Sequence, residues 1–216
     1  IFLLEFADLA SIIKYKMFDT ICHEHLEYYS SKVIDNLCRG NNLRIFDINI
    51  NDINGGSKQY LICHKKSSYK TNKKKIYKIL NSEKKLKLSN EKTFKNFINI
   101  INNSKLKLNN FLKKANNLGK TIHGYGASTK GNVLLQYYKI DNKMIKYVAE
   151  RNKSKYGLYT PSTKIKIISE ALSRFYKPDY YLVLPWHFKK EILHREKEIR
   201  KRGTKFIFPL PKLRII

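Results

Sequence analysis

Residues 121–132 read Thr-Ile-His-Gly-Tyr-Gly-Ala-Ser-Thr-Lys-Gly-Asn, and this stretch indicates the fold class. An apolar run at 121–125 is followed by a glycine-containing turn and then by a helical pattern at 129–138. Glycine lets the backbone turn sharply, and a helix that begins directly after a strand presents free N–H groups to an anion. A strand, a glycine-rich turn and a helix in this order are typical of a nucleotide-binding α/β unit.

The alternation of strands and helices continues through residues 119–216. We predict strands at 121–125, 145–149, 180–184 and 206–209, and helices at 129–138, 169–176 and 187–202. Strands and helices at this spacing favour a parallel sheet that is covered by helices. The sequence therefore predicts a doubly wound, Rossmann-like α/β domain over residues 119–216.

Upstream, residues 1–66 form a second β/α segment and residues 67–118 a helical connector. The predicted strands are 1–5, 43–50 and 58–64, with helices at 6–15 and from Ser30 or Ser31 to about Arg39. Asn54-Gly55-Gly56-Ser57 supplies a tight connection, because Asn and Gly tolerate positive φ. In the connector, Phe94, Phe97, Ile98 and Ile101 follow the i, i+3, i+4, i+7 spacing of an amphipathic helix.

Composition narrows the classes of partner. The net charge of the 216 residues is +27, but Lys is enriched together with Asn, Ile and Tyr in every segment, which indicates compositional bias and not a nucleic-acid partner. No apolar run approaches the roughly 18 residues of a membrane span, so no membrane partner is expected. Three widely spaced cysteines indicate reduced thiols in a cytoplasmic protein. The sequence opens in mid-strand without Met, so we expect it to be part of a longer protein.

The glycine-rich turn supplies the candidate ligand-binding residues of the second domain. Lys130 adds a point charge suited to phosphate, and Glu150 follows Gly126 by 24 residues, about where a Rossmann unit places its ribose-binding acid. The third glycine of the usual pattern is displaced to Gly131, so a turn without a ligand stays an alternative. The candidate substrate-binding residues of this region are Gly124, Tyr125, Gly126, Ala127, Ser128, Lys130, Gly131, Asn132 and Glu150.

A second candidate site lies in the segment Cys22-His23-Glu24-His25-Leu26-Glu27-Tyr28. If the segment is extended, His23 and His25 share one face and Glu24 points the other way. Imidazole is suited to proton transfer near neutral pH, Glu24 can orient it, and Tyr28 can donate to a developing oxyanion. A metal site with two close ligands and a purely structural role are the alternatives.

At these residues the chain resembles the S-adenosylmethionine-dependent sugar C-methyltransferases. Phe18-Asp19-Thr20-Ile21-Cys22-His23-Glu24-His25-Leu26 is similar to a segment of that family, and Gly124 to Asn132 is similar to the opening of its C-terminal domain. Further similar pieces are Arg151 to Lys155, Pro161-Ser162-Thr163, Pro178-Asp179, Trp186-His187-Phe188, Glu191-Ile192 and Phe208 to Pro211. The resemblance extends over nearly the whole chain, in order.

The resemblance implies an enzyme of three parts: a small zinc-binding domain, a central domain that binds S-adenosylmethionine, and a Rossmann-like C-terminal domain. The implied substrate is a nucleotide-activated keto-deoxy sugar that is methylated at the carbon next to its ketone. Residues 1–66 then correspond to the tail of the methyl-donor domain, and the chain contains neither the zinc-binding cysteine cluster nor the methyl-donor loop. We therefore expect the zinc and the donor loop to belong to a part of the protein outside this chain. We also expect these 216 residues to be inactive without that part.

The departures from the family leave the proton acceptor open. Asn54 stands where the family often has His, so if that His removes the proton in relatives, the base of this chain stays open; His25 and His23 are the candidates, and Asn54 is a candidate substrate-binding residue. Glu150 stands where Asp is usual. Two other classes compete with C-methylation. One is a nicotinamide-dependent oxidoreductase domain that uses the glycine-rich turn and Glu150; the other is a basic nucleic-acid-binding module. The oligomeric state is not indicated by the sequence.

Overall fold

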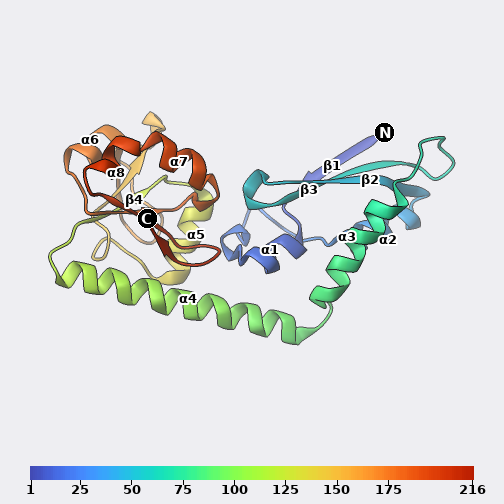
Figure 1. Ribbon diagram of the computed structural model, residues 1–216, viewed down its shortest axis with the longest axis horizontal. Helices are drawn as coiled ribbons and strands as arrows, with labels where there is room; N and C mark the ends of the chain where they lie inside the picture. Colours follow the sequence, from blue (N-terminus) through green and yellow to red (C-terminus); the bar gives the residue numbers. More distant parts are fainter. The chain divides into compact units, whose positions relative to one another are not determined.

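The computed structural model describes residues 1–216, whose contacts divide them into two compact units. The first unit contains Ile1–Met17 and His23–Asn99, and the second contains Phe18–Cys22 and Ile100–Ile216. The long helix α4 (Glu91–Asn117) contributes residues to both units (Figure 1). No helix is long and apolar enough to cross a membrane.

The first unit is a three-stranded antiparallel sheet with helices packed against it. Besides part of α4, its elements are β1 (Phe2–Phe6), α1 (Leu9–Tyr15), α2 (Ser31–Gly40), β2 (Leu43–Asn51), the 3-10 turn η2 (Ile53–Gly55), β3 (Ser57–His64) and α3 (Lys73–Leu86). The strand order is β1-β3-β2, so the last strand lies between the other two. Tyr60 and Ile62 of the central strand are buried in one core with Ile34 of α2 and Ile76 and Ile79 of α3. The helix α3 therefore belongs to the core of the first unit.

Local chemistry sets the ends of these elements as the sequence predicts. Ser30 is the N-cap of α2 and accepts from the amide of Val33, which satisfies one of the free donors of the first turn. The connection between β2 and β3 contains Asn54 at φ 56° and Gly55 at φ 92°. Asn and Gly adopt such left-handed values at low cost, so the tight connection is confirmed.

A lysine buried in the first unit ties four elements together. The Nζ atom of Lys58 on β3 donates to Asp8 Oδ1 at 2.9 Å, to Ser31 Oγ at 3.1 Å and to Glu83 of α3. All four side chains are buried. A buried ammonium group is tolerated only when it is paired and hydrogen-bonded, and here all three of its protons have acceptors.

The second unit is a doubly wound α/β domain. Its elements, besides α4, are the 3-10 turn η1 (Phe18–Thr20), β4 (Ile122–Tyr125), α5 (Thr129–Tyr138), β5 (Tyr147–Glu150), η3 (Lys153–Lys155), β6 (Lys166–Ser169), α6 (Glu170–Phe175), β7 (Tyr180–Val183), η4 (Trp186–Phe188), α7 (Lys189–Arg195), α8 (Lys197–Lys201), β8 (Lys205–Phe208) and β9 (Arg214–Ile215). The sheet order is β6-β5-β4-β7-β8-β9, with every pair parallel except β8 with β9. Helices α4 and α5 lie on one side of this sheet and α6, α7 and α8 on the other (Figure 1). The predicted Rossmann-like class is confirmed for this unit.

Three details of the second unit differ from the prediction. The prediction contains neither β6 nor β9, and β9 has only two residues, too few to show an alternating period. The predicted helix at 187–202 is broken at Glu196 into α7 and α8. The carboxylate of Glu196 is buried, where it accepts from Tyr125 Oη at 2.7 Å and from Arg174 Nε at 3.0 Å. Tertiary hydrogen bonds at this residue thus accompany the break.

The segment η1, although far away in sequence, packs into the second unit. The ring of Phe18 is stacked on Tyr138 of α5, with centroids 5.0 Å apart, and lies 5.3 Å from the ring of Tyr137. Phe18, Asp19 and Thr20 are all buried. The second unit is therefore assembled from two separate stretches of the chain.

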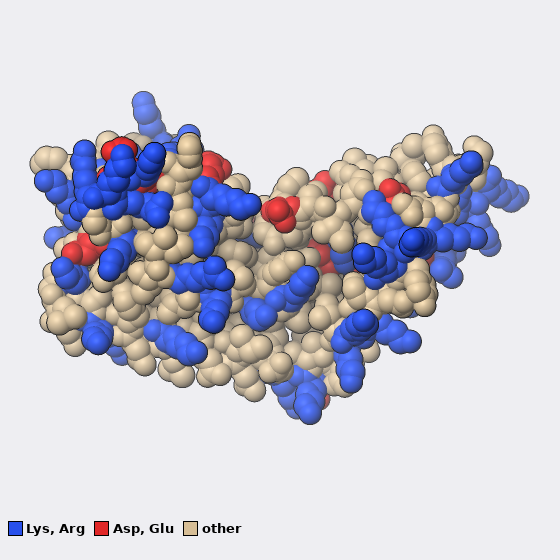
Figure 2. All heavy atoms as spheres, in the orientation of Figure 1, with Lys and Arg blue, Asp and Glu red and all other residues tan.

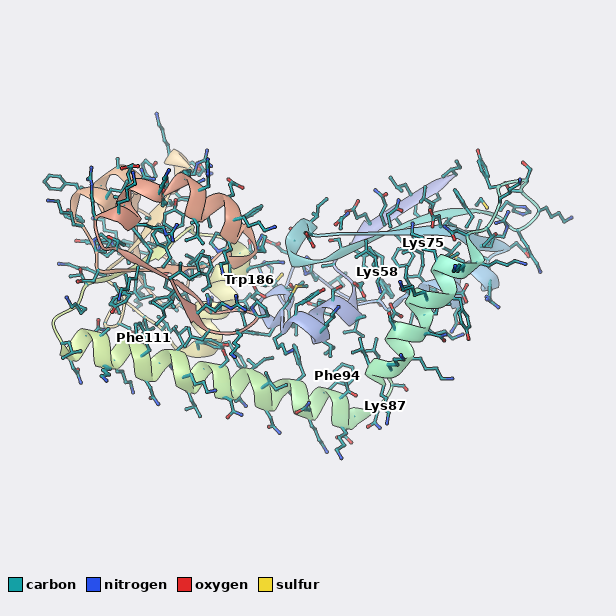
Figure 3. The ribbon with its side chains drawn as sticks, in the orientation of Figure 1. Lys58, Lys75, Lys87, Phe94, Phe111 and Trp186 are labelled. Carbon is teal, nitrogen blue, oxygen red and sulfur yellow. The ribbon has the colours of Figure 1, made fainter.

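We predict that Lys58→Met will destabilise the first unit by about 3–5 kcal/mol, because it leaves the carboxylates of Asp8 and Glu83 buried without their cation. Lys75→Met is the matched control, since the ion pair of Lys75 with Asp47 is partly exposed and is expected to contribute about 1 kcal/mol or less (Figure 3). Urea denaturation followed by circular dichroism measures both. Equal losses in the two variants would contradict the role given to Lys58.

Candidate functional site

A cleft of about 360 Å³ opens at the carboxyl end of the sheet in the second unit. The turns after β4, β5 and β7 meet there, and β4 has β5 on one side and β7 on the other, so the strand order reverses at this point. Ligands of doubly wound folds bind at such a reversal. The lining residues are Tyr125, Gly126, Ala127, Ser128, Glu150, Arg151, Lys155, Glu170, Pro185, Phe188, Glu191, Ile192 and Arg195.

The three glycines of the turn are explained by close packing. A Cβ at Gly126, which has φ +84°, would lie 2.7 Å from Pro185 Cδ. At Gly124 it would lie 2.9 Å from a methyl of Val148, and at Gly131 it would lie 2.7 Å from Leu184 Cβ. Gly131 therefore lets α5 approach the end of β7, and Gly126 lets the turn pass under Pro185. The glycine pattern alone is thus no evidence for a ligand.

The carboxylate of Glu150 is bound by backbone amides. Its Oε2 accepts from the amide of Ala127 at 2.6 Å, and its Oε1 accepts from the amides of Arg151 and Asn152 at 2.9 Å each. Lys155 Nζ donates to the carbonyl of Ala127 at 2.7 Å. These side chains hold the turn from both sides, and the Ala127 amide already has an anionic partner within the protein.

The remaining residues predicted on the turn do not all face the cleft. Ser128 is the N-cap of α5 and accepts from the amide of Gly131 at 3.0 Å. The hydroxyl of Tyr125 donates to Glu196 and accepts from Arg195 at 2.6 Å, and burial raises its pKa. Asn132 has a buried Oδ1 without a hydrogen-bond partner. Of the predicted set, five residues line the cleft, namely Tyr125, Gly126, Ala127, Ser128 and Glu150.

Lys130 is not among the residues that line the cleft and instead lies near the buried carboxyl of Asp19. Burial lowers its pKa, while the charges of Asp19 and Cys22 act in the opposite direction. The two groups come from the Phe18–Cys22 stretch, which belongs to the same unit. The lysine in the first turn of α5 is therefore close to η1.

Asp19 is a member of this group that the sequence did not single out. It is fully buried, its Oδ2 accepts from Trp186 Nε1 at 2.8 Å, and its Oδ1 has no hydrogen-bond partner. Burial raises its pKa to about 6 against the lowering effect of the Trp186 bond and the Lys130 charge. His187, which follows Trp186 in the chain, has a buried Nδ1 without a hydrogen-bond partner. Burial, and to a smaller extent the charge of Lys130, lowers the pKa of His187 to about 4. The Asp19-Thr20 pair, two residues upstream of the His-Glu-His segment, was the available signal, but nothing in the spacing pointed to Trp186.

The His-Glu-His segment follows η1 and is not extended at its start. His23 and Glu24 form a turn, and both side chains are exposed, as is that of His25. The ring of His25 meets that of Tyr28 edge to face, with centroids 6.1 Å apart. Tyr28 is half-buried, and Asn54 lies in η2 of the same unit. The structure places the rings of His25 and Tyr28 in contact, and the catalytic roles expected for them stay a prediction.

Comparison with known proteins gives two matches. Residues 52–211 match the family model of the C-methyltransferase C-terminal domain. The whole chain, 216 residues, is 30% identical to the C-methyltransferase NovU of Streptomyces niveus. The chain spans about half of that relative, 51% of its length.

We predict that the buried carboxyl of Asp19 makes stability depend on pH. Because its pKa is raised from 3.8 to about 6, its contribution to the free energy of unfolding is fully present below about pH 4 and is lost as the pH rises through 6. Asp19→Asn removes the ionisation and keeps an acceptor for Trp186. The stability of the variant relative to the parent protein should therefore rise between pH 4 and pH 7, by up to about 3 kcal/mol.

Asp179→Asn is the contrasting control in the same unit. Burial acts to raise the pKa of Asp179, but the bonds from Thr121 and Lys120 lower it overall. This group stabilises the protein above its unfolded pKa and less as the pH falls, so its variant should lose relative stability as the pH rises. Urea denaturation at several pH values measures both, and a pH-independent difference for Asp19→Asn would contradict the prediction.

Proposed function

This chain belongs to the C-methyltransferase family, and from that premise we propose that it acts in the S-adenosylmethionine-dependent methylation of a nucleotide-activated keto-deoxy sugar, at the carbon next to the ketone. The observation that carries the proposal is the exposed imidazole of His25 against the phenol of Tyr28. This pair supplies an acceptor for a carbon-bound proton and a donor for the oxygen that becomes charged.

The chemistry requires both groups. A C–H bond next to a ketone is a weak acid, so a base removes the proton while a hydrogen-bond donor stabilises the enolate oxygen. The enolate carbon can then accept a methyl group. We propose His23 or His25 as the base, Glu24 as the residue that orients the imidazole, and Tyr28 as the donor to the oxygen. The exposure of both histidines supports their access to a substrate.

Asn54 is proposed as a substrate contact in the same unit. It stands in a left-handed conformation in the turn between β2 and β3, and its short polar side chain is exposed. Carboxamide can donate and accept a hydrogen bond but does not remove a proton from carbon at neutral pH. The base is therefore assigned to a histidine of the His23–His25 segment and not to position 54.

Lys130 is proposed to bind the diphosphate of the nucleotide sugar. It lies in the first turn of α5, where free N–H groups and the helix dipole also favour an anion. The wider surface adds to this attraction, because Lys and Arg are spread over both units while Asp and Glu are few (Figure 2). The five cleft-lining residues of the turn, together with Gly124, Gly131 and Asn132, are proposed to shape the neighbouring part of the substrate site.

The methyl donor supplies the transferred methyl group, but its glycine-rich loop has no counterpart in these 216 residues. No contact to the donor is therefore derived. Likewise, no cluster of three or more His, Cys, Asp or Glu side chains that could hold a metal ion is present. The three cysteines are free, which supports a reducing compartment such as the cytoplasm as the proposed setting.

The oxidoreductase alternative is not favoured. It requires Glu150 to bind the ribose of a nicotinamide cofactor, whereas both carboxylate oxygens of Glu150 accept from backbone amides. It also gives the His-Glu-His segment no part in the reaction.

Lys130→Ala is expected to weaken the binding of thymidine diphosphate by about tenfold or more, because charge-assisted hydrogen bonds to phosphate contribute about 1.5–3 kcal/mol. Isothermal titration calorimetry at about 0.15 M salt measures this while screening the general positive field. Lys113→Ala removes one exposed charge from α4 of the same unit and should leave the affinity nearly unchanged. Equal affinities for Lys130→Ala and the parent protein would reject the role of Lys130.

His25→Ala, made in an enzyme that contains this chain together with its methyl-donor site, is expected to abolish exchange of the substrate C–H with deuterated water. His23→Ala is tested separately, so that the two imidazoles are distinguished. His64→Ala, an exposed histidine of the same unit, is the control and should exchange normally. Exchange at the parent rate in both single variants of the segment would show that neither histidine is the base.

A further inference from the structure

A second cleft, of about 570 Å³, lies within the first unit, between α2, the first residues of β2, the loop after β3 and α3. Strands β2 and β3 are connected through η2, where Asn54 lies, whereas the cleft is at the opposite end of this hairpin, where Leu43 pairs with His64. Its volume falls within the roughly 300–1,000 Å³ typical of small-molecule sites. None of the residues proposed for methyl transfer lines it.

Part of the lining of this cleft is apolar. Ile45 and Ile76 are buried members of the core of the first unit, and Leu43 and Leu80 are partly buried and pack against that core. The ring of Tyr77, also in the lining, is 68% exposed. The cleft therefore offers an accessible apolar surface, against which a ring or a short chain can be removed from water.

The guanidinium group of Arg44 is held in the wall of this cleft by neutral acceptors. It donates to the carbonyls of Lys65 at 3.3 Å, Ser67 at 2.9 Å and Tyr69 at 2.6 Å, and to the hydroxyl of Thr71 at 2.6 Å. These bonds use four of the five N–H groups of the guanidinium and fix its position. No carboxylate is among the acceptors, so the positive charge is fixed without being neutralised.

The other charges around the cleft add to this field. Its single acidic residue, Asp35, is paired with Arg39 at 3.0 Å, while Lys65 and Lys73 are exposed and form no ion pair. Residues 65–78 contain seven lysines and no Asp or Glu, and Figure 2 shows Lys and Arg side chains gathered around α3 and the loop before it. The helix dipole of α3, which begins at Lys73, also favours a negative group here.

We propose that this cleft binds a small amphipathic anion, whose carboxylate or phosphate group lies by Arg44, Lys65 and Lys73 and whose apolar ring or chain lies against Leu43 and Tyr77. The cation in the wall attracts the acidic group, and the apolar lining selects for the rest of the molecule. The site shares no residue with the proposed methyl transfer, so failure of either proposal leaves the other unaffected.

The test is a titration of the ¹⁵N-labelled 216-residue protein with 2-naphthoate at about 0.15 M salt, in parallel with the neutral 2-naphthalenemethanol and with inorganic phosphate. We expect 2-naphthoate to shift the amide resonances of Ile45, Thr71 and Tyr77, and the alcohol and phosphate each to bind at least about fivefold more weakly. An alcohol that binds as tightly would exclude the charges, and phosphate that binds as tightly would exclude the apolar surface. Either result, or no shift at tens of millimolar 2-naphthoate, would overturn the proposal.

Lys65→Ala combined with Lys73→Ala is expected to weaken the binding of 2-naphthoate by about fivefold, because two exposed ammonium groups near its carboxylate are lost. The matched control is Lys66→Ala combined with Lys78→Ala, which removes the same charge from the same loop and helix outside the cleft and should leave the affinity nearly unchanged. All four side chains are exposed, so both variants are expected to fold. Equal weakening in the two variants would assign the binding to the general positive field and overturn the proposal.

Discussion

The second unit depends on the close approach of α5, and of the glycine-rich turn before it, to the sheet. Three positions between 124 and 131 have no side chain, and at each of them a Cβ would lie within 2.9 Å of a neighbouring side chain. Without that approach α5 could not pack against the end of β7, and the turns that line the cleft would not meet. The glycines are first of all a packing requirement, and any ligand site is built on top of it.

Charges buried within each unit were the next constraint on the fold. In the first unit Lys58 of β3 joins the N-cap of α1 to α2 and α3 through three acceptors, so one side chain links three helices to a strand. In the second unit the buried carboxylate of Glu196 accepts from Tyr125 and Arg174 at the point where α7 ends. Asp19 links η1 to Trp186 by accepting from the indole. For Lys58 and Glu196 the cost of burying the charge is offset by hydrogen bonds from distant parts of the chain, whereas burial raises the pKa of Asp19.

The proposed chemistry follows from how these constraints distribute the polar groups. The glycine-rich turn resembles a phosphate-binding turn, but Glu150 and Lys155 bind its backbone, and Lys130, which we propose for the diphosphate, lies elsewhere, beside η1. A fold that is used in many proteins for dinucleotides is here combined with a neutral cleft and a separate cation. The nucleotide sugar that we propose as substrate has a diphosphate and rings, which require different surroundings.

The sequence by itself determined the class of the second unit, the ends of α2 and α5, the tight turn at Asn54 and the family, because these depend on local patterns of apolar residues, caps and glycines. It also pointed to His25 and Tyr28, which are close in the chain. Only the tertiary structure decided that Glu150 binds the backbone of the turn, that Lys130 lies by Asp19, and that Trp186 reaches across 167 residues to an aspartate. Hydrogen bonds and burial between residues so far apart leave no periodic trace in the sequence, and the pKa of a group such as Asp19 is set by that burial alone.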